Sequence, residues 1–476
     1  MKHAMHSSHP FRLHLLALAA CASLAGGCAV GPAYQRPAAA EPAHYKEAAT
    51  APGWLPAAPA DALERGPWWT LFGDPVLDQL AAAVEVSNQN VAAAAASYEQ
   101  ARALVRGQRA GLFPSVDVSG AGTRSGGGGA AQGAKNNYRA EIGASWEPDI
   151  WGRLRAGVGG ANAAAEAGGA DLAAARLSAQ GELAVNYFSL RQGDAQQALL
   201  ATTIVGYQRV LDITQNRFNA GIAAKSDVLQ AETQLANARI DQLALTRTRA
   251  QLEHAIGVLL GKAPADFALA PAPWQVLVPA LPPGLPSTLL QRRPDIAAAE
   301  RRVAVANEQI GIARAAYFPS LNLSASYGSG ASRVADLFKA SSNLWSFGAS
   351  AAYSLFNAGA TTAAVDAARA AHAAAVARYR QTVLAAFADV EDQLAAGAVL
   401  LRQQDLRLQA SQAADQVEAH MLNRYRAGQL AYSEVVMAQA TALSARRALV
   451  QAQADRQTTA VALIQALGGG WHAPGS

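Results

Sequence analysis

Alternating apolar and polar side chains mark two regions of the chain, each directly after a Phe-Pro-Ser sequence. Such a period of two over about ten residues is typical of β-strands with one apolar face. The apolar positions are Val116, Val118, Tyr138, Ile142 and Trp146 in the first region, and Leu321, Leu323, Tyr327, Trp345, Phe347 and Tyr353 in the second. The pattern predicts one hairpin at about 115–147, with its tip at the Gly126–Gly129 run, and another at about 320–353.

The rest of the chain favours long helices. No proline occurs from Asp149 to Ala263 or from Ser320 to Ala473, and 361–426 contains a single glycine. At 1.5 Å per residue such a stretch approaches ~100 Å, a length typical of coiled coils. Apolar residues three and four apart predict packed stripes at Val228, Ala231, Leu235 and Ala238, and at Val435, Ala438, Ala442 and Ala445. We therefore expect a fold that is mainly α with a small β part.

The chain contains a tandem duplication. A shift of 205 residues places Leu112-Phe113-Pro114-Ser115 on Tyr317-Phe318-Pro319-Ser320. A shift of 207 residues places Arg217-Phe218-Asn219-Ala220-Gly221 on Arg424-Tyr425-Arg426-Ala427-Gly428. We predict repeat 1 at 75–261 and repeat 2 at 286–468, preceded by an extended segment at 28–74, joined by a Pro-rich linker at 262–285 and followed by a short tail at 469–476.

The predicted strands have the length of membrane-spanning strands, about 9–11 residues, with aromatic residues near their ends. The same pattern also suits a soluble hairpin packed on the helices. Four strands cannot close a membrane barrel, because the smallest single-chain barrels have about eight and hydrocarbon does not tolerate open edges. If these hairpins span a membrane, several copies share one barrel, and a trimer supplies twelve strands.

Composition changes this picture little. The 476 residues are 51% hydrophobic, 16% charged and 7% aromatic, with a formal net charge of +4. So small an excess of positive charge does not indicate a nucleic-acid-binding protein. A mean hydropathy of +0.05 is too low for a protein of many membrane helices. The longest uncharged stretch past the N-terminal region, Phe267 to Gln291, is interrupted by six prolines and predicts no spanning helix.

The N-terminus has the features of a secretory signal. Lys2 and Arg12 precede a short apolar run, and small residues lead to Cys28. We predict a lipoprotein signal peptide at 1–27 with lipid attachment at Cys28. Cys21 is an alternative lipid site, since it follows Leu18-Ala19-Ala20. A third interpretation is an ordinary cleaved signal in which neither cysteine carries a lipid. The chain from Cys28 on holds no second cysteine, which excludes a disulfide within it.

No pattern of catalytic residues stands out. The histidines beyond the signal are scattered without the spacing of metal ligands, and the sequence contains no nucleophile elbow and no phosphate-binding loop. We expect a protein that is not an enzyme and that has no metal and no cofactor other than a covalent lipid on Cys28.

Several motifs resemble outer-membrane efflux lipoproteins of the NodT/OprM type, the TolC-like outer membrane factor family. They are Cys28 to Pro37 (CAVGPAYQRP), Trp68 to Pro75 (WWTLFGDP), Leu289 to Ile296 (LLQRRPDI) with Ala299-Glu300-Arg301, Tyr317 to Ser320 (YFPS) and Arg217 to Gln230 (RFNAGIAAKSDVLQ). The resemblance runs from Cys28 to about Gly468. It implies a trimeric α-barrel joined to a twelve-stranded transmembrane β-barrel in the Gram-negative outer membrane, with a large periplasmic part.

The resemblance also implies a role. Such proteins are the exit duct of a tripartite efflux system, alongside a periplasmic adaptor (a membrane fusion protein) and an inner-membrane transporter, here expected to be of the RND type. The competing hypothesis is a periplasmic coiled-coil lipoprotein scaffold without a pore. Four methionines and nine histidines give no sign of a dedicated copper route, so drugs or small organic compounds are the expected cargo.

Family members narrow the periplasmic end of the pore with acidic residues just after the helical turns. The corresponding positions here are Asp227, after Gly221, and Glu434, after Gly428. Family members often carry a further aspartate three residues beyond, where this chain has Met437. The alternative role of both acids is to stabilise the helix macrodipole, at about 0.3–1 kcal/mol each.

Overall fold

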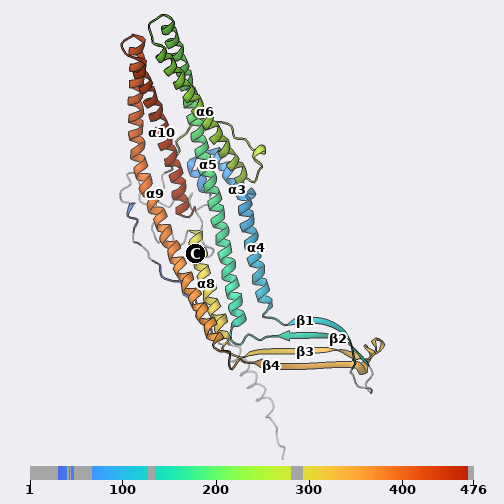
Figure 1. Cartoon of the computed structure of the whole chain (residues 1–476). Coiled ribbons are helices and arrows are strands. Elements are labelled where there is room, and N and C mark those ends of the chain that lie inside the picture. The colour runs from blue at the N-terminus through green and yellow to red at the C-terminus, as the bar shows by residue number, and fades with distance from the viewer. Residues whose placement is uncertain are drawn as a thin grey trace, which may run out of the picture. The chain divides into compact units, whose positions relative to one another are not determined.

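The computed structural model describes residues 30–39, 42, 44–47, 67–126, 134–279 and 293–469. In these residues helices dominate and four strands form a single sheet (Figure 1). The predicted fold class is confirmed, since long helices alternate with two hairpins in each of which the strands are antiparallel neighbours. Cys21 and Cys28, and most of the Gly126–Gly129 run, lie outside the described residues.

The helices follow the duplication in length and in position. Helices α4 (Gln89–Ala110) and α8 (Pro294–Ala315) each have 22 residues and begin 205 residues apart. Helices α5 (Arg153–Asn219) and α9 (Ala360–Arg426) each have 67 residues, and α6 (Lys225–Leu259) and α10 (Tyr432–Ala466) each have 35. Both of these pairs begin 207 residues apart. Each residue of α4, α5 and α6 therefore has an identifiable counterpart in α8, α9 and α10.

Shorter elements complete the chain. A 3-10 turn, η2 (Trp68–Phe72), precedes α3 (Pro75–Ser87), and η3 (Pro264–Asp266) follows α6. Two further turns, η4 (Val334–Asp336) and η5 (Ala340–Ser342), lie in the connection between the last two strands.

The sheet has the order β1-β2-β3-β4, and every neighbouring pair is antiparallel. The strands are β1 (Ser115–Ser125), β2 (Lys135–Trp146), β3 (Ser320–Ala331) and β4 (Asn343–Ala352). Strand β2 of repeat 1 pairs with β3 of repeat 2, so the two hairpins form one surface (Figure 1). Tyr353, which the alternation includes, lies one residue past β4.

The structure forms two compact units, each built from both repeats. The first contains Ser97–Gly168 and Ala298–Tyr379 with the N-terminal residues to Ala38, and it includes the whole sheet. The second contains Gly169–Ala297, Ala39–Ala96 and the residues from Arg380 on, and it includes α6 and α10.

In the first unit, the N-terminal residues are held on α8. The Tyr34 hydroxyl donates to Glu300 Oε1 at 2.7 Å, and Arg301 Nη2 donates to the same oxygen at 2.8 Å. Asn307 Nδ2 donates to the Pro32 carbonyl at 2.9 Å. Two motifs that lie far apart in the sequence, the one after Cys28 and the one around Glu300, therefore contact each other directly.

In the second unit, an aromatic cluster fixes the start of α3. Trp68 is fully buried against Phe72, which packs on Phe188 of α5 with ring centroids 5.0 Å apart. Asp74 caps α3 by accepting from the Val76 and Leu77 amides, and its second oxygen accepts from the Tyr187 hydroxyl at 2.6 Å. The cap and the cluster together fix the WWTLFGDP motif on α5.

The predicted helix stripes are buried in the same unit. On α6, the four stripe residues between Val228 and Ala238 are all buried. On α10, Val435, Ala438 and Ala442 are buried and Ala445 is half-buried. Small side chains at these positions allow the helices to approach closely, as in coiled coils.

A buried charge network joins α5, α6 and the chain after α6. Asp194, with 2% of its side chain exposed, accepts from Arg249 Nε at 2.7 Å and from Arg191 Nη1 at 3.0 Å. The two arginines also donate to the carbonyls of Leu269 and Ala270, and Glu253 accepts from the Leu269 amide at 2.6 Å. The network thereby fastens the first part of the inter-repeat segment to the helices.

We predict that Asp194→Ala strongly destabilises the protein. It leaves two buried guanidinium groups without their carboxylate, and breaking a buried pair in this way costs about 3–5 kcal/mol. Denaturant unfolding of the detergent-solubilised chain measures the loss. Glu99→Ala, which removes only the exposed partner of Arg102, is the control and leaves the unfolding midpoint unchanged. Equal midpoints for both variants would contradict the assignment.

Candidate functional site: the exposed sheet and the two helical turns

One face of the sheet carries a continuous row of large apolar side chains. Val118 lies opposite Ile142, Ile142 opposite Tyr327, and Tyr327 opposite Trp345. The row crosses all four strands and therefore both repeats. A parallel row two residues along contains Val116, Ala144, Ala325 and Phe347.

The other described residues leave these side chains uncovered. Val118 is 81% exposed and Trp345 is 78% exposed, and Ile142, Tyr327 and Phe347 are exposed as well. Contiguous apolar surface of this kind is rare on a protein that faces only water, and it marks contact with a membrane or another protein.

The opposite face is different in chemistry. One cross-strand row consists of Asp117, Gly143, Ser326 and Ser346, and the last two hydroxyls lie 2.9 Å apart in a hydrogen bond. Leu344 is the large apolar residue on this face, opposite Gly328. One face of the sheet is thus suited to hydrocarbon and the other to water.

Both outer strands have a free edge in the single chain. Strand β1 pairs with β2 alone and β4 pairs with β3 alone. Because the four strands alternate in direction, β4 runs antiparallel to β1, and β4 of one copy can continue the antiparallel order onto β1 of another. The geometry of the edges is therefore compatible with closure by further copies.

The two helical turns that carry the predicted gate residues have the same backbone structure. Gly221 and Gly428 adopt left-handed conformations with φ of 71° and 73°, where a side chain is disfavoured. The amide after each glycine donates back to the carbonyl of an arginine, Ile222 to Arg217 at 2.8 Å and Gln429 to Arg424 at 2.9 Å. Both turns end their first helix with the Schellman bonding pattern.

Sequence reasoning missed the residue that joins these turns. Arg217, at the end of α5, donates from Nη1 to the Tyr425 carbonyl of α9 at 2.9 Å, and its guanidinium lies 4.8 Å from the centre of the Tyr425 ring. The Tyr425 hydroxyl in turn bonds Thr214 at 3.1 Å. Arg217 belongs to the repeated motif that revealed the duplication, but the sequence does not say that it reaches the other repeat.

The core beneath the turns is made by all four helices. Val210, Ala231, Tyr425, Tyr432 and Val435 form one buried cluster. Burial raises the pKa of the Tyr432 hydroxyl above its ordinary range, and the nearby Tyr425, Tyr207 and Asp227 add to the rise. This hydroxyl therefore remains neutral at any physiological pH.

The predicted gate residues occupy equivalent positions. Asp227 is in the first turn of α6 and half-buried, and Glu434 is in the first turn of α10 and exposed. Neither helix has a side-chain N-cap, since Ala224 and Ala431 occupy the cap positions. Met437 lies one turn beyond Glu434 and is 58% exposed. Both the pore role and the macrodipole role are consistent with these positions.

The described residues contain neither a membrane-spanning helix nor a metal-binding cluster. None of their helices combines the length and the apolar character needed to cross a membrane. No group of three or more histidines, cysteines, aspartates or glutamates among them is arranged to hold a metal ion.

The fold and its exposed sheet define a class: a tandem-repeat channel protein with long helices and a small membrane-facing sheet. The sequence profile described as "Outer membrane efflux protein" matches residues 80–262 and 285–469. The chain therefore belongs to the outer membrane efflux protein family, and it is an outer membrane channel component of an efflux system.

Individual relatives agree over nearly the whole chain. The chain is 33% identical to the probable efflux pump outer membrane protein TtgC of Pseudomonas putida over 96% of each chain. It is 31% identical to the pyoverdine export outer membrane protein OpmQ of Pseudomonas aeruginosa, over 96% of this chain and 97% of the relative. Among solved structures, the outer-membrane channel OprN matches with a TM-score of 0.85 and 29% identity, over 93% of this chain and 100% of OprN. The open state of MtrE from Neisseria gonorrhoeae matches with a TM-score of 0.79 and 26% identity, over 93% of this chain and 98% of MtrE.

The predicted function and outer membrane location are confirmed, and the scaffold hypothesis is not supported.

We predict that Arg217→Gln loosens the end of α9. Hydrogen bonds from charged groups contribute about 1.5–3 kcal/mol, so local opening becomes about ten- to a hundredfold more frequent. Hydrogen exchange of the backbone amides at 422–436 measures this opening. The control is Arg424→Gln, the same substitution at the repeat counterpart, whose side chain is exposed. Equal protection in the two variants would refute the joining role of Arg217.

Proposed function

We propose that three copies of the chain form a continuous passive duct. In this assembly the four-stranded sheets close into one twelve-stranded outer-membrane barrel, and the helices form a periplasmic tube. The observation that carries the proposal is the apolar row across all four strands, on a sheet whose two edges are free.

The strand count supports more than two copies, and three is the smallest such number. An eight-stranded barrel fills its interior with side chains, so two copies leave no passage, whereas twelve strands enclose a lumen. The apolar rows then face lipid, and the row of Asp117, Gly143, Ser326 and Ser346 faces the lumen.

The N-terminus supports a second attachment to the membrane. Residues 30–36 lie on α8 in the unit that contains the sheet, fastened through Tyr34 and Asn307. Cys28 precedes this segment by two residues. Lipidation of Cys28 places the acyl chains beside the barrel rather than at the far end of the tube, and we keep Cys28 as the lipid site in preference to Cys21.

The partners proposed for the duct are a periplasmic adaptor and an inner-membrane transporter of the RND type, because the duct has no energy source of its own in this scheme. The names of relatives refer to antibiotic, toluene and pyoverdine efflux or export. These are organic compounds, and we propose small organic compounds as the class of cargo for this chain as well.

At the helical turns, we propose that Asp227 and Glu434 of three copies form rings of carboxylates at the periplasmic entrance. The support is their matched position in the first turns of α6 and α10. Rings of acidic side chains favour cations over anions.

Insertion of the sheet is tested by two substitutions at adjacent residues of β3. Tyr327→Arg places a charge on the apolar row, which costs about 2–4 kcal/mol at the middle of a bilayer. Ser326→Arg places the same charge on the opposite face and is tolerated. The readout is the yield of folded trimer and its conductance in planar bilayers. Equal yields for the two variants, or a wild-type protein that is monomeric and does not conduct, would overturn the duct.

The carboxylate rings are tested by ion selectivity. We expect Asp227→Ala and Glu434→Ala each to lower the cation-to-anion permeability ratio about fivefold, since ~1 kcal/mol of charge–charge energy corresponds to that factor. Asp266→Ala, in η3 beyond the other end of α6, removes the same charge as a control and leaves the ratio unchanged. An unchanged ratio in both gate variants would assign these acids to the helix macrodipole alone.

A further inference from the structure

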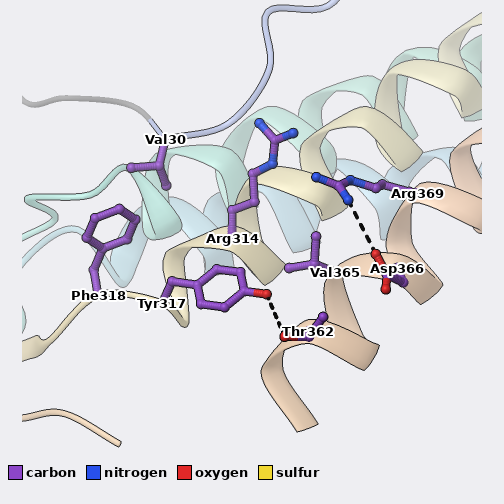
Figure 2. A pocket seen from close by; sticks show the side chains of 8 residues that line it. All are labelled: Val30, Arg314, Tyr317, Phe318, Thr362, Val365, Asp366 and Arg369. Atoms are coloured by element: carbon purple, nitrogen blue, oxygen red, sulfur yellow. Dashed lines mark hydrogen bonds and ion pairs between the residues drawn. The ribbon is translucent and has the colours of Figure 1, made fainter. Parts of the chain in front are cut away.

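A pocket lies at the foot of the second hairpin, within the first unit. Its volume is about 470 Å³, within the range of small-molecule sites. It is formed by the end of α8, the connection to β3 and the first turns of α9. Tyr317, Phe318 and Val365 supply apolar surface, while the side chains of Arg314 and Arg369 reach into the space above Val365 (Figure 2).

The charges of this pocket are not balanced. Arg369 bonds Asp366 at 3.3 Å, an exposed pair that leaves further donors of the guanidinium free to bond. Arg314 has no carboxylate within ion-pair distance among the described residues. The Tyr317 hydroxyl donates to Thr362 Oγ1 at 3.0 Å. The pocket therefore holds two guanidinium groups and one carboxylate, which pairs with Arg369 alone.

Repeat 1 shows what the same place looks like with a single arginine. The counterpart of Arg314 is Arg109, and the counterpart of Arg369 is Asn162. Arg109 Nη2 donates to Asn162 Oδ1 at 3.2 Å, so the arginine of the first repeat has an acceptor at this position. In repeat 2 the asparagine is replaced by a second arginine, and two guanidinium groups cannot accept from each other. An anion that accepts from both restores the balance.

Two arginines that follow the first hairpin each pair with a carboxylate. Glu147 accepts two donors of Arg153 at 2.7–3.3 Å, and Asp149 accepts from the Arg155 Nε at 3.1 Å. Both of these arginines have a carboxylate partner, whereas Arg314 has none among the described residues.

The surroundings indicate the source of the anion. Tyr317 and Phe318 directly precede β3, and the Trp151 ring stacks on Phe318 with centroids 4.7 Å apart. Val30, two residues after Cys28, lines the pocket, and its amide donates to the Trp151 carbonyl at 3.3 Å. Aromatic residues at the end of a membrane strand and basic pockets beside it are typical of the headgroup region.

We propose that this pocket binds the headgroup of a membrane phospholipid, with Arg314 and Arg369 donating to its phosphate and the aromatic side chains against its glycerol. Arginine matches phosphate geometry through its planar set of donors. The placement of the pocket at a membrane surface rests on the proposed function. The phosphate binding itself rests on the two arginines.

The test uses the purified full chain in detergent and a water-soluble short-chain phosphatidylglycerol, with binding measured by titration calorimetry. Arg314→Gln and Arg369→Asn each weaken binding at least tenfold. Arg369→Asn installs the side chain that repeat 1 carries at this place and therefore preserves the local fold. Arg109→Gln is the matched control and leaves the affinity unchanged, and Arg369→Lys retains part of it.

Equal affinity in the wild type, Arg314→Gln and Arg369→Asn would overturn the proposal. So would inorganic phosphate that competes at the same concentration as the lipid, because it would identify a free-anion site. Conductance of the same preparations separates this result from the duct: a wild type that binds the lipid and does not conduct refutes the duct alone, and conducting variants with unchanged lipid affinity refute the pocket alone.

Discussion

Backbone hydrogen bonding at the edges of the sheet is the constraint on which the rest depends. In hydrocarbon no water replaces a missing partner, and each unsatisfied backbone group costs several kcal/mol. Strands β1 and β4 each have one free edge in the single chain, while their apolar side chains are suited to lipid. A chain with this sheet can enter a membrane only together with further copies. Assembly is therefore a condition of insertion and not a later addition to a finished protein.

The duplication supplies a common framework on which individual positions have diverged. Matched helices have equal lengths, and both turns use a left-handed glycine followed by an acidic residue in the next helix. A difference between matched positions of these helices can therefore be attributed to the side chains at those positions, because the surrounding helices match in length. Arg217 reaches the carbonyl of Tyr425, whereas its counterpart Arg424 is exposed. The arginine near the hairpin foot bonds an asparagine in repeat 1 and lines a pocket together with another arginine in repeat 2.

In the second unit, buried charged side chains hold the segment between the repeats against α5 and α6. Asp194 is nearly inaccessible and binds two arginines, which also bind carbonyls of the segment between the repeats. That segment is rich in proline, and each proline lacks a backbone N–H and disfavours regular structure. Side-chain donors from α5 and α6 bond its carbonyls instead. The network bonds backbone groups that no regular secondary structure pairs, and in doing so it fixes the first part of the segment between the repeats on α5 and α6.

The sequence by itself determined the features that depend on local periodicity: the long helices, the two hairpins, their alternation and the duplication. Val228 and Ala231 are buried as their spacing predicts, because helical geometry alone places them on one face. Contacts between distant residues were decided by the tertiary structure. The pairing of β2 with β3, the bond of Arg217 to Tyr425 and the placement of Arg314 and Arg369 in one pocket depend on how elements pack across about 50 to 200 residues of chain. Residue types indicate what each side chain can bond, but packing selects the partner.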